Sequence, residues 1–390
     1  MTDLRSDTRD TAAAGRAPDA PGRAPEYVRA IAPYVGGKPI DELARELRLD
    51  PLSIVKLASN ENPRGPGPRV REAVAAAAAE LPRYPDGNGY ALKHALAARH
   101  ARSMDEIVLG NGSNDVLELV AQAFLRPGDE TVYSRHAFIV YPLATQARGA
   151  RGIEVPAHRY GHDLDAMRAA ITPKTRIVFV ANPNNPTGTW LAAGAIEAFV
   201  ASIPRDVVVV VDEAYDDYLD PPQRSPAIGW IGRYPHLVVT RTFSKAFGLA
   251  GLRVGYGVMD RAVAGLLNRV RQPFNVNALA QAAALAALAD TGYVEESRRI
   301  NREGMRSLEE GFAALGLEWL ASRGNFVLVR VGDAMRVYQA LLERGVIVRP
   351  VANYGLPEWL RVTVGVPAEN ARFLTALGEA LAAARGSADG

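Results

Sequence analysis

One lysine lies in a mostly apolar and glycine-rich segment, "TRTFSKAFGLAGLRVGYG" (240–257), just after a strand-like run of residues. Because charged side chains are normally kept in water, Lys245 belongs either to a solvated surface helix or to a buried site. In a buried site the lysine amine has a lowered pKa and can form a Schiff base with a carbonyl group. Nearby hydroxyls and an arginine could bind a phosphate group: Thr242, Ser244 and Arg253.

Polar side chains also follow three other strand-like runs. Ser113 and Asn114 begin a helix after "EIVLG", where free backbone N–H groups could bind a phosphate, although most such turns only cap a helix. Asn185 lies in the turn "PNNPTG" and either points into a cleft or bonds its own turn. Asp212 ends a valine-rich strand, three residues before Tyr215, and a helix N-cap is the simpler role for this aspartate.

All of these side chains meet if the strands form one parallel sheet, because ligands bind beyond the carboxyl ends of such strands. Together they offer a phosphate site, an amide, a phenol, a carboxylate and a nucleophilic lysine. Pyridoxal 5'-phosphate needs all of them. Its aldehyde takes the lysine, its ring nitrogen needs an anion and its phenolic oxygen needs hydrogen-bond donors. The combination is therefore specific although each part is ambiguous.

Short runs rich in valine and isoleucine alternate with helical stretches in the middle of the chain. Strands of this kind are buried on both faces, which is typical of a parallel sheet covered by helices, so we expect an α/β fold. The expected strands cover residues 106–110, 130–134, 176–182, 206–212, 236–242 and 253–259. Helices are expected between them, for example over 115–125 and 191–203.

The length of 390 residues exceeds what one hydrophobic core usually serves, so we expect two lobes. Residues 1–24 mix Arg, Asp, Pro and Gly and are expected to form a disordered tail. Residues 66–275 form the larger, cofactor-binding domain, and 276–390 form a smaller α+β domain. The arm 25–65 is too short to fold alone and is expected to pack with the smaller domain.

Composition excludes several classes of function. With 45 basic against 43 acidic residues, the net charge of +2 indicates neither a nucleic-acid nor a membrane partner. The chain has no cysteine, no signal-peptide pattern and no apolar run long enough to span a membrane, so the cytoplasm is expected. No metal is expected at the histidines of "HRYGH" (158–162), because Gly161 breaks a helix and no glutamate lies between them.

The chain resembles the fold-type-I pyridoxal-phosphate aminotransferases, and among them the histidinol-phosphate aminotransferases. The match runs from about residue 27 to the C-terminal helix. This resemblance implies a large domain with a mostly parallel seven-stranded sheet between helices, plus the smaller α+β domain. It rests on "LASNENPRGP", "RYPDGNGYALKHALA", "GNGSNDVLELV", "FIVYPLAT", "NPNNPTG", "VDEAYDDY", "RTFSKAFGLAGLRVGYG", "GVIVRP" and "LRVTVG".

The resemblance also implies a role for each matching residue. Lys245 would be the Schiff-base lysine, Asp212 the partner of the pyridine nitrogen, and Asn185 and Tyr215 the donors to the phenolate oxygen. Phe138 would stack on the ring, where many relatives have tyrosine. Ser113, Asn114, Thr242, Ser244 and Arg253 would hold the phosphate, Tyr84 would reach the partner's site in a homodimer, and Tyr34, Arg349, Arg361 and Asn185 would contact the substrate.

The reaction expected from this resemblance converts histidinol phosphate and 2-oxoglutarate to imidazole-acetol phosphate and glutamate, in histidine biosynthesis. Lys245, once released from the cofactor, would remove the α-proton as general base. Two alternatives remain within the family, an aromatic amino acid aminotransferase and a phosphothreonine decarboxylase-like enzyme. A nucleotide-binding dehydrogenase is disfavoured because no G-x-G-x-x-G follows the first strand.

Overall fold

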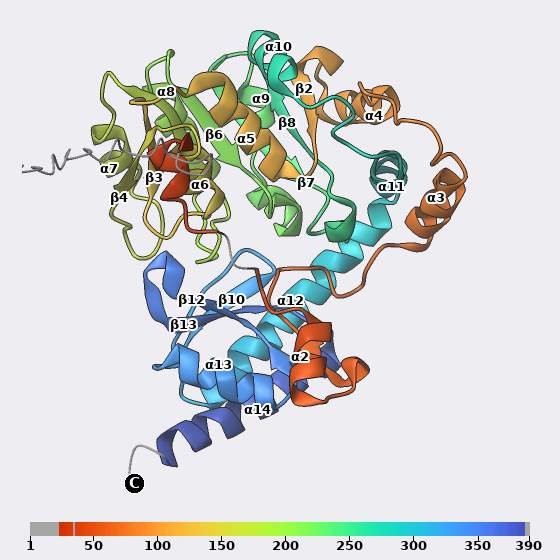
Figure 1. Cartoon of the computed structure of the whole chain (residues 1–390), viewed down its shortest axis with the longest axis vertical. Helices are drawn as coiled ribbons and strands as arrows, with labels where there is room; N and C mark the ends of the chain where they lie inside the picture. Colours follow the sequence, from red (N-terminus) through yellow and green to blue (C-terminus); the bar gives the residue numbers. More distant parts are fainter. Residues whose placement is uncertain (1–22, 34–35, 387–390) are drawn as a thin grey trace, which may run out of the picture.

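The molecule consists of a larger and a smaller lobe that are joined by a long helix (Figure 1). The computed structural model describes residues 23–33 and 36–386, so residues 1–22 of the expected tail and Tyr34 lie outside the described residues. None of the described helices combines the length and the apolar character needed to cross a lipid bilayer.

A seven-stranded sheet in the order β2-β8-β7-β6-β5-β3-β4 is the centre of the larger lobe. Every pair from β7 to β4 is parallel, whereas β8 is antiparallel to both of its neighbours. β8 departs from a purely parallel sheet because its connection to β7, residues 243–254, contains no crossover α-helix. The strands are β2 (Ile107–Gly110), β3 (Glu130–Ser134), β4 (Arg151–Val155), β5 (Thr175–Ala181), β6 (Val208–Asp212), β7 (Leu237–Thr242) and β8 (Gly255–Met259).

Helices cover both faces of this sheet, which confirms the expected α/β fold. In β5, Ile177 and Phe179 pack with α5, α6 and α10, whereas the alternate residues Val178 and Val180 pack into the core on the other face. The helices of this lobe are α3 (Pro68–Ala78), α4 (Tyr90–His100), α5 (Ser113–Phe124), α6 (Val140–Gln146), α7 (Leu164–Ala169), α8 (Ala193–Ser202), α9 (Ala227–Trp230), α10 (Arg261–Val270) and α11 (Ala278–Ala289).

The smaller lobe has an antiparallel sheet in the order β12-β13-β10-β9, packed against helices. The N-terminal arm joins this lobe, because β1 pairs in parallel with β11 through Val55 and Val346. Its elements are α2 (Ile40–Leu47), β1 (Val55–Lys56), β9 (Trp319–Leu320), β10 (Phe326–Arg330), α13 (Ala334–Glu343), β11 (Val346–Ile347), β12 (Arg349–Val351), β13 (Leu356–Thr363) and α14 (Pro367–Gly386). The first helix of the arm, α1 (Glu26–Arg29), instead lies against the larger lobe, where Gln146 Nε2 of α6 donates to the Tyr27 carbonyl at 3.3 Å, so the expected packing of the arm with the smaller lobe does not extend to α1 (Figure 1).

Helix α12 (Thr291–Ala314) connects the two lobes (Figure 1). Its first turns contribute Tyr293 and Val294 to the core of the larger lobe, and its later turns contribute Leu308 and Phe312 to the core of the smaller one. The alanine-rich helix α11 lies beyond the domain boundary expected at residue 275, but its buried alanines pack with the larger lobe.

Candidate active site

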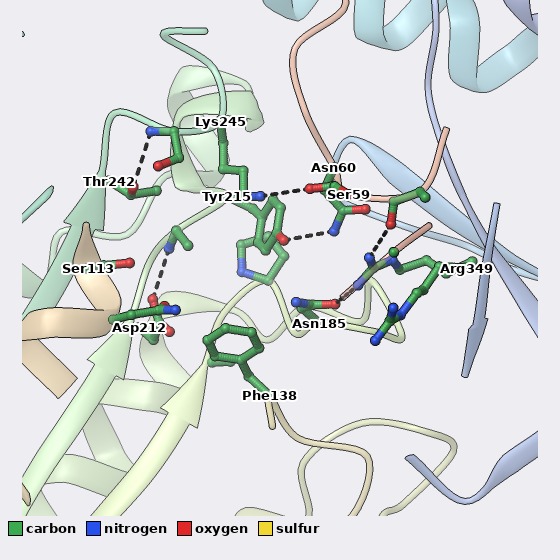
Figure 2. Close-up of a pocket in the computed structure, with 18 of the residues that line it drawn as sticks. Ser59, Asn60, Ser113, Phe138, Asn185, Asp212, Tyr215, Thr242, Lys245 and Arg349 are labelled. Atoms are coloured by element: carbon green, nitrogen blue, oxygen red, sulfur yellow. Dashed lines mark hydrogen bonds between the residues drawn. The ribbon is translucent and has the colours of Figure 1, made fainter. Parts of the chain in front are cut away.

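A pocket between the two lobes brings together twelve of the side chains singled out in the sequence (Figure 2). It opens at the carboxyl ends of β5, β6 and β7, which is where an open α/β sheet binds ligands. The side chains that line it are Ser113, Asn114, Phe138, Asn185, Asp212, Tyr215, Thr242, Ser244, Lys245, Arg253, Arg349 and Arg361.

One end of the pocket is suited to an anion. Helix α5 begins here at Ser113, and no side chain caps its first backbone N–H groups. Arg253 lies across from it and donates from Nη1 to Ser244 Oγ at 3.3 Å. Gly112 has a φ of 86°, and a Cβ there would collide with the Arg253 guanidinium. The glycine therefore allows arginine, hydroxyl and helix N-terminus to approach one another closely.

Asp212 lies at the carboxyl end of β6 and is held by three hydrogen bonds. Tyr141 Oη donates to Oδ2 at 3.0 Å, and Thr240 Oγ1 donates to Oδ1 at 3.0 Å. The backbone N–H of Ala214 donates to Oδ1 at 3.2 Å. Burial raises the pKa of Asp212, while these donors oppose the rise. Because Tyr141 lies on α6 and Thr240 on β7, side chains from two other elements hold the carboxylate in place. Asp212 therefore does more than cap its own turn.

Lys245 approaches the same pocket from the loop after β7. Its Nζ donates to the backbone carbonyl of Ser59 at 3.2 Å. Burial and the nearby cations Arg361 and Arg253 lower the pKa of Lys245 to about 7. A large fraction of the amine is therefore neutral, and so nucleophilic, at neutral pH.

The amide and the phenol predicted as donors also point into the pocket (Figure 2). Asn185 Oδ1 accepts from Arg361 Nη1 at 2.6 Å, which leaves the amide nitrogen to act as the donor. The Tyr215 hydroxyl accepts from Asn60 Nδ2 at 2.8 Å. Burial raises the pKa of Tyr215 to about 12, so the phenol stays protonated.

Two arginines line the side of the pocket formed by the smaller lobe. Arg349 on β12 and Arg361 on β13 are direct cross-strand partners, so both guanidinium groups come from the same patch of sheet. Arg361 is buried, and its Nη2 donates to the carbonyl of Ala58 at 2.7 Å. The arrangement offers a concentrated positive charge to an anionic group of a ligand.

Phe138 lines the pocket and contacts Tyr141 edge-on, with the ring centroids 5.8 Å apart. Tyr84 is not part of this pocket. It is 82% exposed and stacks on Phe274 at 4.8 Å. Tyr34 lies outside the described residues.

Several contributors to the site were given no role from the sequence, among them Asn60, Tyr141 and Thr240. Asn60 lies within the family-like segment "LASNENPRGP", which was the one available signal for it. Tyr141 is indistinguishable in the sequence from a core aromatic residue, and Thr240 from any strand threonine. Their roles come from partners on other elements.

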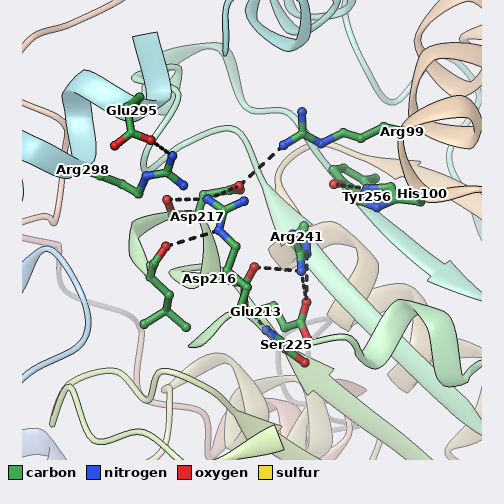
Figure 3. A network of polar contacts seen from close by, with 12 residues as sticks. Arg99, His100, Glu213, Asp216, Asp217, Ser225, Arg241, Tyr256, Glu295 and Arg298 are labelled. Carbon is green, nitrogen blue, oxygen red and sulfur yellow. Dashed lines mark hydrogen bonds and ion pairs between the residues drawn. The ribbon is translucent and has the colours of Figure 1, made fainter. Parts of the chain in front are cut away.

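Three buried charged residues, each next in sequence to a pocket residue, form a cluster: Arg241, Glu213 and Asp216 (Figure 3). Arg241 donates from Nε and Nη2 to Glu213 Oε2 at 2.8 and 2.7 Å, and its Nη2 is 2.9 Å from Asp216 Oδ2. Glu213 directly follows Asp212, and Asp216 directly follows Tyr215. The cluster therefore ties the backbone of two pocket residues to β7.

Comparison with known proteins agrees with this geometry. Residues 53–377 match the family model described as aminotransferase class I and II. The chain is 60% identical over 361 residues to histidinol-phosphate aminotransferase 1 of Cupriavidus pinatubonensis, covering 92% of this chain and 96% of that protein. It is also 60% identical over 356 residues to histidinol-phosphate aminotransferase 2 of Pseudomonas aeruginosa, covering 91% and 96%.

Solved structures show the same fold. Histidinol-phosphate aminotransferase from Sinorhizobium meliloti, in complex with pyridoxal-5'-phosphate, superposes with a TM-score of 0.86 at 29% identity, covering 93% of this chain and 98% of that one. An aspartate aminotransferase variant from Thermus thermophilus gives a TM-score of 0.80 at 27% identity, covering 91% and 99%. The resemblance found in the sequence is confirmed, and the chain belongs to the aminotransferase class I and II family.

Proposed function

We propose that the pocket binds pyridoxal 5'-phosphate through Lys245. The residues present fit this cofactor, because the anion-binding end lies beside a buried carboxylate and a lysine whose pKa is lowered to about 7. Ser113, Asn114, Thr242, Ser244 and Arg253 would hold the phosphate, and Asp212 would face the ring nitrogen. Asn185 and Tyr215 would donate to the phenolic oxygen, and Phe138 would cover the ring.

The bound cofactor would supply an electron sink for the bond that breaks at the substrate's α-carbon. Lys245 Nζ, free of its own link once the amino substrate has bound, would take the α-proton and deliver it to the former aldehyde carbon of the cofactor, on the other side of the nitrogen. Asp212 would keep the ring nitrogen protonated, which requires the carboxylate to stay ionised. Tyr141, Thr240 and the Ala214 N–H all donate to it and favour that form.

For the substrate we propose histidinol phosphate, with 2-oxoglutarate as amino acceptor, in histidine biosynthesis. The observation that carries this assignment is the pair Arg349 and Arg361, cross-strand partners lining the pocket that also holds Lys245. Their charge suits both anions, the phosphate of the donor and the carboxylates of the acceptor. The names of the relatives at 60% identity support the same donor.

The purified enzyme should prefer histidinol phosphate to phenylalanine and tyrosine by at least about 10²-fold in kcat/KM, because the donor's phosphate presents more negative charge and more acceptor oxygens to the two arginines than the single carboxylate of an aromatic amino acid. Steady-state assays with 2-oxoglutarate as acceptor measure this ratio. Higher kcat/KM with the aromatic amino acids would replace this proposal with an aromatic aminotransferase. Release of carbon dioxide from phosphothreonine would indicate a decarboxylase.

We further propose that the enzyme is a cytoplasmic homodimer and that Tyr84 completes the partner's pocket. The support for the dimer is the exposure of Tyr84 together with other large apolar side chains that are close to it in the chain or stack on it. These are Leu81, Tyr90 and Phe274, on or beside α3, α4 and the loop before α11.

A further inference from the structure

Asn60 is a buried junction between the two lobes. Its backbone N–H donates to Thr363 Oγ1 on β13 at 2.9 Å, and its side-chain Nδ2 donates to the Tyr215 hydroxyl at 2.8 Å (Figure 2). Asn325 Nδ2 donates to the Asn60 carbonyl at 3.1 Å. The exposed fraction of each of these four residues is 4% or less. Asn60 thus connects the smaller-lobe sheet to a phenol in the pocket of the larger lobe.

The structure gives each hydrogen bond in this chain a direction. Thr363 Oγ1 accepts from the Asn60 N–H and donates its own hydrogen to Asn60 Oδ1, 3.2 Å away. The oxygen end of the amide thus faces Thr363, and the nitrogen end faces Tyr215. The Tyr215 oxygen accepts there, so its single hydrogen is directed elsewhere, toward the pocket that its side chain lines.

We propose that Asn60 and Thr363 are positioning residues that hold the Tyr215 hydroxyl as a hydrogen-bond donor toward the phenolic oxygen of the cofactor. This inference rests on the proposed cofactor and is independent of which amino donor the enzyme uses. A donor at that oxygen stabilises its anionic form. We call the hydrogen bonds from Thr363 to Asn60 and from Asn60 to Tyr215 the relay. If the relay is broken, the hydroxyl of Tyr215 can rotate, and the deprotonated form of the cofactor loses part of this stabilisation.

The readout is the pH titration of the visible absorbance of the holoenzyme, recorded without substrate. Asn60→Gly removes the amide, and glycine suits this position because residue 60 has a φ of 55°. We expect the midpoint of the titration to move upward by about one pH unit, the effect of losing one oriented hydrogen bond to a charged form. An unchanged midpoint would overturn the proposal.

A double-variant cycle separates this role from a general structural one. Tyr215→Phe should raise the midpoint at least as much as Asn60→Gly, because it removes the donor itself. Adding Asn60→Gly to Tyr215→Phe should then leave the titration midpoint where Tyr215→Phe alone puts it, because Asn60 acts only through the hydroxyl that is already missing. Additive shifts would show that Asn60 affects the cofactor by another route and would contradict the relay.

If the Asn60 variants fold poorly, two substitutions of Thr363 test the same proposal. Thr363→Val keeps the shape but removes the hydroxyl, so the amide can turn over, and the midpoint should rise. Thr363→Ser keeps the hydroxyl and should titrate like the wild type. Equal midpoints for the two variants would overturn the proposal. A wild-type protein with no visible absorbance after incubation with pyridoxal 5'-phosphate would instead contradict the proposed cofactor.

Discussion

Replacing Lys245 by alanine should abolish transamination and the absorbance band of the Schiff base between lysine and cofactor. The variant loses both the amine that takes the aldehyde and the base that moves the α-proton, and the loss of a general base alone costs about 10²–10⁴-fold. The rest of the pocket should keep its geometry, because within residues 23–33 and 36–386 the Lys245 amine makes one hydrogen bond, to the Ser59 carbonyl. Steady-state assays and absorbance spectra of the purified variant measure both losses.

The matched control is Lys174→Ala, which removes an exposed lysine at a turn before β5. This variant should retain wild-type turnover and the wild-type spectrum. Undiminished turnover in Lys245→Ala would contradict the assignment of Lys245, whatever the control shows. Equal losses in the two variants would point to a nonspecific effect of lysine removal.

Replacing Arg241 by methionine should lower the free energy of unfolding by about 3–5 kcal/mol, the usual cost of removing one partner from a buried ion pair. Methionine fills a similar volume but leaves the carboxylates of Glu213 and Asp216 buried without their cation (Figure 3). Urea denaturation followed by circular dichroism, at equal protein and cofactor concentrations, measures the change.

The control for this variant is Arg330→Met. Arg330 also pairs with two carboxylates, those of Glu318 and Glu358, but its side chain is 46% exposed. Exposed pairs of this kind contribute about 0–1 kcal/mol, so this variant should unfold close to the wild type. An Arg241→Met protein no less stable than Arg330→Met would show that the buried cluster does not hold the β6 and β7 ends together.

The strands of the central sheet could be predicted where burial is complete. In β5, β6 and β7 both faces are covered by helices, so the valine-rich runs matched the observed strands to within two residues. The edge strand β4 was not predicted, because Arg151 and Glu154 in its five residues interrupt the apolar pattern. The reversal of β8 was also missed, since apolar content does not report strand direction.

The site could be predicted where a chemical group follows directly after a strand. Asp212, Asn185 and the segment around Lys245 were found in this way, because the carboxyl ends of the strands place them at one edge of the sheet. Contacts between distant segments could not be found. Asn60 meets Tyr215 across 155 residues and Thr363 across 303, and no local pattern encodes such a pairing.

The most direct test of the account is to find which lysine carries the cofactor. The chain has five candidates, Lys245 and the four others Lys38, Lys56, Lys93 and Lys174. Borohydride reduction of the wild-type protein with pyridoxal 5'-phosphate, followed by peptide mass mapping, makes the link permanent and locates it. The account predicts a phosphopyridoxyl group on the peptide that contains Lys245. Stoichiometric labelling of one of the other four lysines, or of none, would contradict it.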